Sequence, residues 1–175
     1  RIYYFNLKGA VMLLKSVFIG FLSFSILHAE TLKECKIEAD KISGCVEREY
    51  HSNGNLRFEI PYKNGKEVGV ETWYYENGNI EEEILHKSNK TKWYDQNGNL
   101  QAELSFKNDK LHGDLKFYTE NKELLVAIKA QNHKLMNGTC SNGKTLTHKE
   151  LEDMFNFVGV NEVMTFLRKI CLANP

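Results

Sequence analysis

The chain has 175 residues, of which 42% are hydrophobic and 26% are charged, a composition typical of one ordinary globular domain with a small addition. Lysine and arginine together number 23, and aspartate and glutamate also number 23, so no net charge would attract nucleic acid or an anionic lipid surface. We therefore expect no nucleic-acid partner.

The first segment with a clear pattern begins at Met12 and is typical of a secretory signal peptide. A positively charged start is followed by an apolar run over residues 17–27 and by Ala29, a small residue before a polar turn. This run is short for a membrane span, which needs about 20 residues, although an uncleaved anchor is the alternative. We expect residues 1–11 to be an upstream extension and residues 12–29 to be a signal peptide cleaved near Ala29. The mature protein would then be periplasmic or secreted, with no stable membrane span.

Three copies of Asn-Gly-Asn followed by Leu or Ile dominate the middle of the chain. They occupy Asn53–Leu56, Asn77–Ile80 and Asn97–Leu100, and successive copies start 24 and 20 residues apart. A fixed period of this size indicates a repeat architecture. Asn-Gly is the preferred centre of a two-residue hairpin turn, in which both central positions need a positive φ. We therefore predict tight turns with structural roles for Asn53, Gly54, Asn77, Gly78, Asn97 and Gly98.

The segments between these turns alternate apolar and polar residues, as residues 56–62 illustrate, and this period is typical of strands with one face on a core. A second turn signal falls midway between the first ones. It comprises Asn64-Gly65, Asn108-Asp109 and Asn132-His133, followed by Gly69, Gly113 and Gly138. We expect longer hairpin loops there, with a left-handed glycine at the exit. The fold is predicted to be mainly β: an elongated antiparallel meander of tandem β-hairpin repeats over residues 47–145.

In each copy an aromatic residue precedes Asn-Gly-x-Leu, and an alternating strand, a lysine-containing turn, a glycine and a closing aromatic pair follow. The residues that carry this pattern are Tyr50, Asn53, Gly54, Leu56, Gly69, Trp73 and Tyr74; Tyr75, Asn77, Gly78, Ile80, Trp93 and Tyr94; and Asn97, Gly98, Leu100, Gly113, Phe117 and Tyr118. The pattern resembles the MORN repeat variant family over about residues 46–145. The resemblance implies an interaction scaffold, common in bacterial proteins, some of which are antitoxins of toxin–antitoxin pairs.

Helical spacing replaces the alternation in the C-terminal segment. Thr147 and Glu150 have the spacing of a capping box, and apolar residues follow at helical spacing up to Gly159. Asn161 is a candidate cap for a second helix. We expect residues 146–175 to be a small helical cap over the open end of the sheet, because repeat arrays need terminal caps. A helix pair that binds a partner is the alternative.

All four cysteines lie beyond the predicted signal peptide, and an even number in an exported chain indicates disulfides. Four cysteines permit three pairings. We favour Cys35–Cys45 and Cys140–Cys171, because each pair flanks one end of the repeat region. Residues 30–46 would then form an N-terminal, cysteine-containing cap. Four reduced thiols are the alternative.

The sequence contains no residue pattern that predicts catalysis, a metal site or a cofactor. The histidines beyond the signal peptide are His51, His86, His112, His133 and His148. They lie 15 or more residues apart, without the spacing of metal ligands. Cys140 and His148 lack the glycine-rich turn and the orienting partner of a thiol enzyme. Glu82 should point away from Glu81 and Glu83, because side chains on a strand alternate between faces. We therefore predict a protein that is not an enzyme and binds no metal or cofactor.

The aromatic residues near the turns are the feature with binding potential. Stacked tyrosine and tryptophan rings can hold a peptide or a sugar, and the residues we single out are Trp73, Tyr75, Trp93 and Tyr118. Cross-strand packing that fixes the register is the alternative. The expected function is an exported, non-catalytic module for protein–protein or cell-envelope interaction, whose partner is an unknown protein or envelope component. The alternatives are an antitoxin that uses the same sheet face and a secreted hydrolase with an unrecognised site.

Overall fold

The computed structural model describes residues 32–173 and divides the chain into two compact units, residues 1–34 and 35–175. Only residues 32–34 of the first unit are described, so the predicted extension (1–11) and signal peptide (12–29) lie outside the described residues. Within residues 32–173, no helix combines the length and the apolar character that a membrane span requires.

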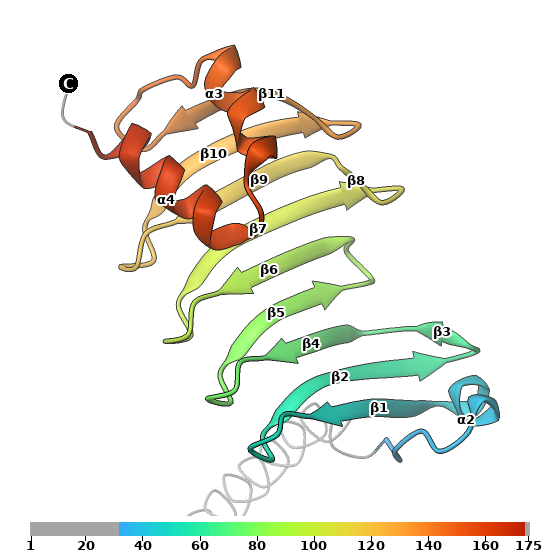
Figure 1. Ribbon diagram of the computed structural model, residues 1–175. Helices are drawn as coiled ribbons and strands as arrows, with labels where there is room; N and C mark the ends of the chain where they lie inside the picture. Colours follow the sequence, from blue (N-terminus) through green and yellow to red (C-terminus); the bar gives the residue numbers. More distant parts are fainter. Residues whose placement is uncertain (1–31, 174–175) are drawn as a thin grey trace, which may run out of the picture. The chain divides into compact units, whose positions relative to one another are not determined.

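The second unit is an 11-stranded antiparallel sheet in which strands follow one another in chain order (Figure 1). The strands are β1 (Cys45–Tyr50), β2 (Leu56–Lys63), β3 (Lys66–Glu67), β4 (Val70–Tyr74), β5 (Ile80–Leu85), β6 (Lys90–Tyr94), β7 (Leu100–Lys107), β8 (Lys110–Leu111), β9 (Gly113–Tyr118), β10 (Leu124–Gln131) and β11 (Lys134–Cys140). The two-residue strands β3 and β8 pair only with β2 and β7 and extend their hairpins. The predicted β-meander of tandem hairpins is confirmed.

The helices are α2 (Glu38–Ser43), α3 (His148–Asp153), a short 3₁₀ turn (Met154–Asn156) and α4 (Val160–Cys171). The predicted capping box begins α3: the Glu150 N–H donates to Thr147 Oγ1 (3.2 Å) and the Thr147 N–H to Glu150 Oε2 (2.7 Å). The predicted cap of the last helix was wrong, because α4 begins one residue before Asn161 with Gly159 as its N-cap.

The Asn-Gly-Asn turns form, but not with the predicted two-residue geometry. In each turn, the backbone N–H of the residue two positions before the first Asn closes a loop of three residues. For His51 this N–H donates to the Asn55 carbonyl at 2.8 Å, across residues 52–54. Only the glycine is left-handed, with φ of 88° at Gly54, whereas Asn53 keeps a negative φ. The physical reason is a side-chain hydrogen bond, since Asn53 Oδ1 accepts from the Asn55 N–H (3.0 Å) and holds a local turn.

The tight turns occur instead at the second turn signal, where longer loops were predicted. Both central residues are left-handed there, with φ of 55° and 71° at Asn64 and Gly65 and of 51° and 68° at Asn132 and His133. The flanking residues pair directly, as Lys63 does with Lys66. The predicted left-handed exit glycine is present in two copies, since φ is 70° at Gly69 and 92° at Gly113 but not positive at Gly138.

The core lies between the C-terminal strands and the helices. Direct cross-strand partners share a face of the sheet, and the register places Trp73, Glu82, Trp93, Ala102, Phe117 and Val126 in one row. We call this the helix-side face, because α4 packs on β7 and β10, and α3 on β11 (Figure 1). The largest buried side chains in this core include Leu115, Leu125, Ile128, Met164 and Leu167. Full burial of each such side chain contributes about 1.5–3 kcal/mol.

Both predicted disulfides are present, with Cα–Cα distances of 5.1 Å for Cys35–Cys45 and 5.4 Å for Cys140–Cys171. The first joins the segment before α2 to β1, and α2 packs against β1 and β2. The second joins the end of β11 to the end of α4, and so attaches the C-terminal helix to the last strand. Each disulfide therefore secures one end of the sheet.

Candidate functional site

Side-chain amides join neighbouring turns at one end of the strands. In the first turn, the Nδ2 groups of Asn53 and Asn55 both donate to the Glu76 carbonyl, at 2.8 and 2.7 Å. In the second turn, Asn77 and Asn79 donate in the same way to the Gln96 carbonyl, also at 2.8 and 2.7 Å. In these two turns the second Asn therefore joins its own turn to the next one, a role that the turn pattern alone did not reveal.

This series of amide bonds ends at Asp95. The equivalent residues of the first two turns bond forward: His51 Nε2 lies 2.8 Å from the Tyr74 carbonyl, and Tyr75 Oη donates to the Tyr94 carbonyl at 2.7 Å. Asp95 instead accepts from the Asn99 N–H at 2.8 Å and from its Nδ2 at 3.0 Å. Burial opposes ionisation, but these hydrogen bonds hold the pKa of Asp95 below its usual value. Within residues 32–173, no side-chain amide joins the third turn to the fourth.

The face opposite the helices, which we call the outer face, carries tyrosines bonded to glutamates. Tyr74 Oη donates to Glu59 Oε1 (3.1 Å), and Tyr94 Oη donates to Glu83 Oε2 (2.6 Å). Burial and the Glu59 carboxylate raise the pKa of Tyr74 to about 12. Burial and the Glu83 carboxylate likewise raise the pKa of Tyr94. These hydroxyls therefore stay protonated and serve as fixed donors.

Charges on the outer face largely neutralise one another through cross-strand ion pairs. These pairs are Arg48–Glu59 (3.3 Å), Lys92–Glu83 (3.9 Å), Lys90–Glu103 (2.8 Å) and Lys129–Asp114. Tyr118 lies on this face, where burial and the Glu103 carboxylate raise its pKa. Tyr118 is thus separated from Trp73 and Trp93, whose counterpart on β9 is Phe117, buried in the core.

The helix-side face is organised differently around Glu82. Its direct cross-strand partners are Trp73 on β4 and Trp93 on β6, and the Trp73 ring lies 4.8 Å from that of Phe58. Burial raises the pKa of Glu82, the Trp93 hydrogen bond opposes this shift, and the charges of Glu71 and Glu81 add to it. Among the described residues, no lysine or arginine pairs with Glu82. The site therefore presents a carboxylate between two indole rings.

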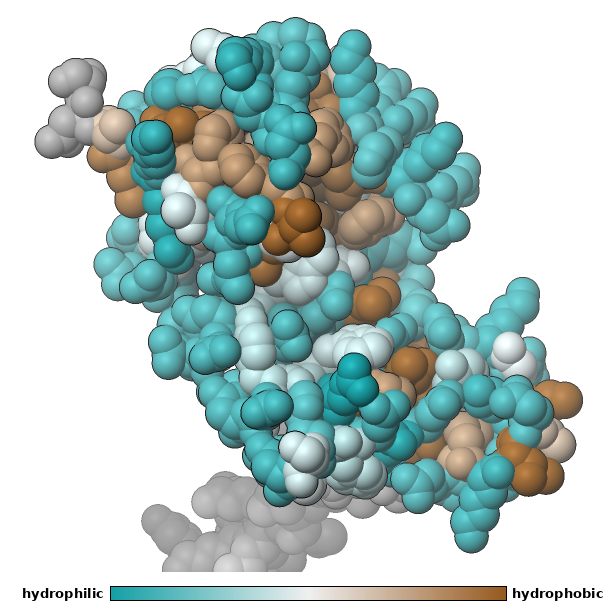
Figure 2. All heavy atoms as spheres, viewed as in Figure 1, coloured by the Kyte–Doolittle hydropathy of each residue, from teal (hydrophilic) through white to brown (hydrophobic). Residues whose placement is uncertain are grey.

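The helices leave the middle strands of this face uncovered by any described element (Figure 1). Figure 2 shows hydrophobic atoms gathered around the C-terminal helices, whereas the middle of the same face is mostly pale or hydrophilic. A pocket of about 250 Å³ lies at the boundary, lined by Tyr75, Glu81, Glu82 and Trp93 together with residues 158–161. The structure thus brings Tyr75 and Trp93 together and places Trp73 two strands from Trp93. The contribution of residues 158–161 was not predicted.

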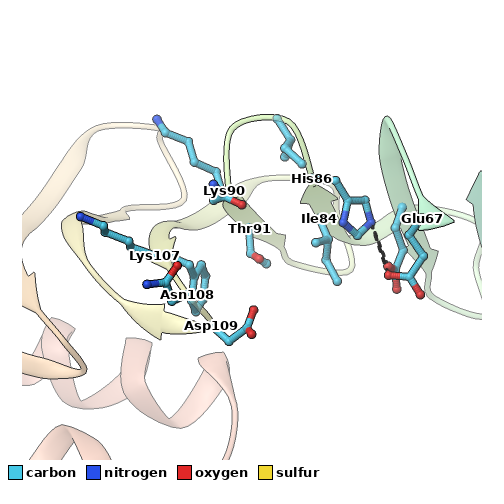
Figure 3. Close-up of a pocket in the computed structure, with 12 residues that line it drawn as sticks. Glu67, Ile84, His86, Lys90, Thr91, Lys107, Asn108 and Asp109 are labelled. Carbon is cyan, nitrogen blue, oxygen red and sulfur yellow. Dashed lines mark ion pairs between the residues drawn. The ribbon is translucent and has the colours of Figure 1, made fainter.

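A larger pocket of about 580 Å³ lies between the β3–β4 segment, the β5–β6 turn and the β7–β8 turn (Figure 3). His86 points toward Glu67 in this pocket (Figure 3), and its Nε2 lies 3.9 Å from Glu67 Oε2 and 3.4 Å from Glu71 Oε2. Trp73 Nε1 donates to the other oxygen of Glu71 at 2.7 Å. The sequence did not indicate this cluster, because its members are separated by up to 19 residues.

The thiol-enzyme alternative is not supported at Cys140, which is bonded to Cys171 and so carries no free thiol. His148 lies 3.0 Å from Glu152 on the surface of α3, and the His133 ring packs against Phe155 with centroids 5.3 Å apart. Glu82 and Glu83 lie on opposite faces, as predicted from alternation.

Comparisons with known proteins identify the repeats. The family described as MORN repeat variant matches residues 46–64, 67–88 and 89–108. The search of curated proteins found no match. Among solved structures, the chain is similar to the Glycosylation Associate Protein (Gap123) complex from Streptococcus agalactiae, at 12% identity and a TM-score of 0.40, over 71% of this chain and 23% of that chain.

The matched residues end at the turn before β8, although the strand and turn layout continues to β11. In the fourth turn Lys122 takes the glycine position with φ of 65°, so the geometry persists where the motif has changed. MORN repeats generally mediate protein or membrane interactions. Residues 46–108 are therefore three adjacent MORN repeat variants.

Proposed function

We propose that the protein is an exported, non-catalytic interaction module that binds a protein of the cell envelope through the uncovered part of its helix-side face. The binding surface consists of Phe58, Trp73, Tyr75, Glu82 and Trp93. Interaction is the general role of MORN repeats. The two disulfides favour a periplasmic or secreted location over the cytosolic antitoxin alternative, because cytosolic thiols are kept reduced.

Glu82 is the observation that carries this proposal. On the outer face the carboxylates of Glu59, Glu83 and Glu103 have cationic partners. Glu82, by contrast, is half-buried between two tryptophans and has no such partner among the described residues. A binding protein can supply the cationic partner that this carboxylate lacks. Aromatic side chains are enriched where binding energy is concentrated.

This chemistry defines the partner that we expect: a protein segment with a lysine or arginine beside aromatic or aliphatic side chains. The cation would pair with Glu82, and the apolar groups would pack on Trp73 and Trp93. Each good aromatic contact contributes about 0.5–1.5 kcal/mol beyond the area that it buries.

The test is capture of envelope proteins on the immobilised, oxidised chain and on two charge-reversal variants. Glu82→Lys changes the proposed surface, and Glu103→Lys makes the same change on the outer face of β7. Circular dichroism confirms that both variants are folded. We expect a bound protein that is retained by the native chain and by Glu103→Lys but lost with Glu82→Lys. Equal retention by both variants, or retention of cytosolic proteins alone, would refute the proposal.

The proposed location is tested separately by intact-mass analysis of the natural protein. Export predicts an N-terminus near residue 30 and four oxidised cysteines. A cytosolic protein with four free thiols would favour the antitoxin alternative and exclude the exported module.

A further inference from the structure

Three potential metal ligands meet at the pocket of Figure 3. The ligand atoms of Glu67, Glu71 and His86 all lie within 4.8 Å of one another. His86 Nε2 is buried and has no hydrogen-bond partner, although two carboxylate oxygens lie close to it. Buried polar atoms are rarely left unpaired, and such an atom requires an explanation.

The sheet positions these groups before any ligand binds. Glu67 lies on β3 and Glu71 on β4, separated by the left-handed residue Gly69. The backbone N–H of His86 donates to the Gly69 carbonyl (3.2 Å). This bond joins the end of β5 to the segment that carries both glutamates. The Trp73 indole fixes one oxygen of Glu71, and the other oxygen lies toward His86.

The two carboxylates of the cluster lack a lysine or arginine partner among the described residues. Lys90 and Lys107 line the pocket, but their side chains extend away from His86 (Figure 3). The side chain of Glu71 is 10% exposed, so water screens its charge only in part.

We propose that His86, Glu71 and Glu67 bind a divalent transition-metal ion of the Zn²⁺ type. Bonds of about 2.0–2.2 Å to nitrogen and oxygen ligands place neighbouring ligand atoms of a tetrahedral site roughly 3.3–3.6 Å apart. The distance from His86 to Glu71, 3.4 Å, fits without change. The distance to Glu67, 3.9 Å, needs a small shift of a carboxylate side chain that is 46% exposed at a hairpin.

The donor set selects the class of ion. An imidazole nitrogen suits zinc and its transition-metal neighbours better than magnesium or calcium, and the cluster offers no thiolate for a softer ion. Two carboxylates balance the charge of a divalent ion. The protein supplies three ligands, so the fourth position would face the pocket and hold water or a group from a bound molecule.

The test uses the full chain with both disulfides formed, stripped of metal by a chelator. Zn²⁺ is titrated calorimetrically, and Co²⁺ is titrated by its visible absorption, which is intense for tetrahedral sites. We expect one ion per chain with tetrahedral Co²⁺ absorption. His86→Ala should lower the affinity at least about 100-fold, and Trp73→Phe, which frees the Glu71 carboxylate, about 10-fold.

His148→Ala is the matched control, because it removes the histidine of another His–Glu pair, at 3.0 Å to Glu152 on the exposed surface of α3. It should leave the affinity unchanged. Glu67→Gln, at an exposed hairpin, provides a second ligand variant whose fold is not at risk and which should weaken binding. Absence of binding to the native chain overturns the proposal. Binding that survives both ligand variants also overturns it.

Discussion

The two disulfides should stabilise the fold unequally, because they close loops of different length. Cys140–Cys171 spans 31 residues and Cys35–Cys45 spans 10. In the chain-entropy description, a cross-link stabilises the fold by restricting the unfolded chain, and longer loops lose more entropy. The expected contributions are about 3.7 kcal/mol for Cys140–Cys171 and about 2.7 kcal/mol for Cys35–Cys45.

Each contribution can be measured in a variant that retains only one bond. Cys35→Ala/Cys45→Ala keeps the long loop, and Cys140→Ala/Cys171→Ala keeps the short one. Urea unfolding of each variant, oxidised and reduced, compares identical side chains, so the difference in unfolding free energy reports the cross-link alone.

We expect reduction to cost the long-loop variant about 1 kcal/mol more than the short-loop variant. Equal losses, or a larger loss for Cys35–Cys45, would refute the loop-entropy argument. Such a result would show that local structure in the unfolded chain, rather than loop length, controls the contribution of each bond.

Three further predictions concern single side chains. Glu82→Gln should raise the unfolding free energy at pH 7. The raised pKa of Glu82 makes the folded state bind more protons than the unfolded state, so the stability of the native protein falls as the pH rises above the usual glutamate range. Thermal unfolding should show that the gain from the substitution vanishes below about pH 4. Asn55→Ala should cost about 0.5–1.5 kcal/mol in urea unfolding through loss of the bond to the Glu76 carbonyl, and no loss would show that the amide bond contributes nothing. Leu167→Ala, at a side chain that is 0% exposed, should lower the unfolding free energy by about 2–5 kcal/mol. Leu172→Ala, at a side chain that is 57% exposed, should lower it by less than about 0.5 kcal/mol. Similar losses would mean that α4 does not pack on the core as described.

Periodicity predicted the fold because each repeat has the same local constraints. Alternation in the strands, recurrent turn residues and the capping box at Thr147 are short-range signals, and the structure follows them. The disulfide pairing also followed from the order of elements, since each pair lies at one end of the array. Short-range patterns thus predicted the strands, their order in the sheet and the two C-terminal helices, but not α2.

The turn types could not be read in the same way. Asn-Gly is compatible both with a two-residue turn and with a three-residue loop in which only the glycine is left-handed. At Asn53 the choice depends on a side-chain bond to the Asn55 N–H and on a carbonyl in the next repeat. The first partner lies in the same turn, but the carbonyl comes within reach only once neighbouring turns are stacked.

The binding surface and the candidate metal site depend on register, which residue types alone do not reveal. Tyr118 carries the same kind of side chain as Tyr75, yet it lies on the outer face because the helix-side position on β9 belongs to Phe117. His86 looked isolated in the sequence. Pairing of β4 with β5 brings it beside Glu71 and Glu67.

Asp95 also bears on how the array could lengthen by tandem duplication. A copied unit inserted between the first two turns would bring its own asparagine donors and would find a backbone acceptor in the turn that follows. A unit inserted after the third turn would receive no such bond, because Asp95 keeps the Asn99 amide within its own turn. We therefore expect a unit inserted between the first two turns to stabilise the array more than a unit inserted after the third turn.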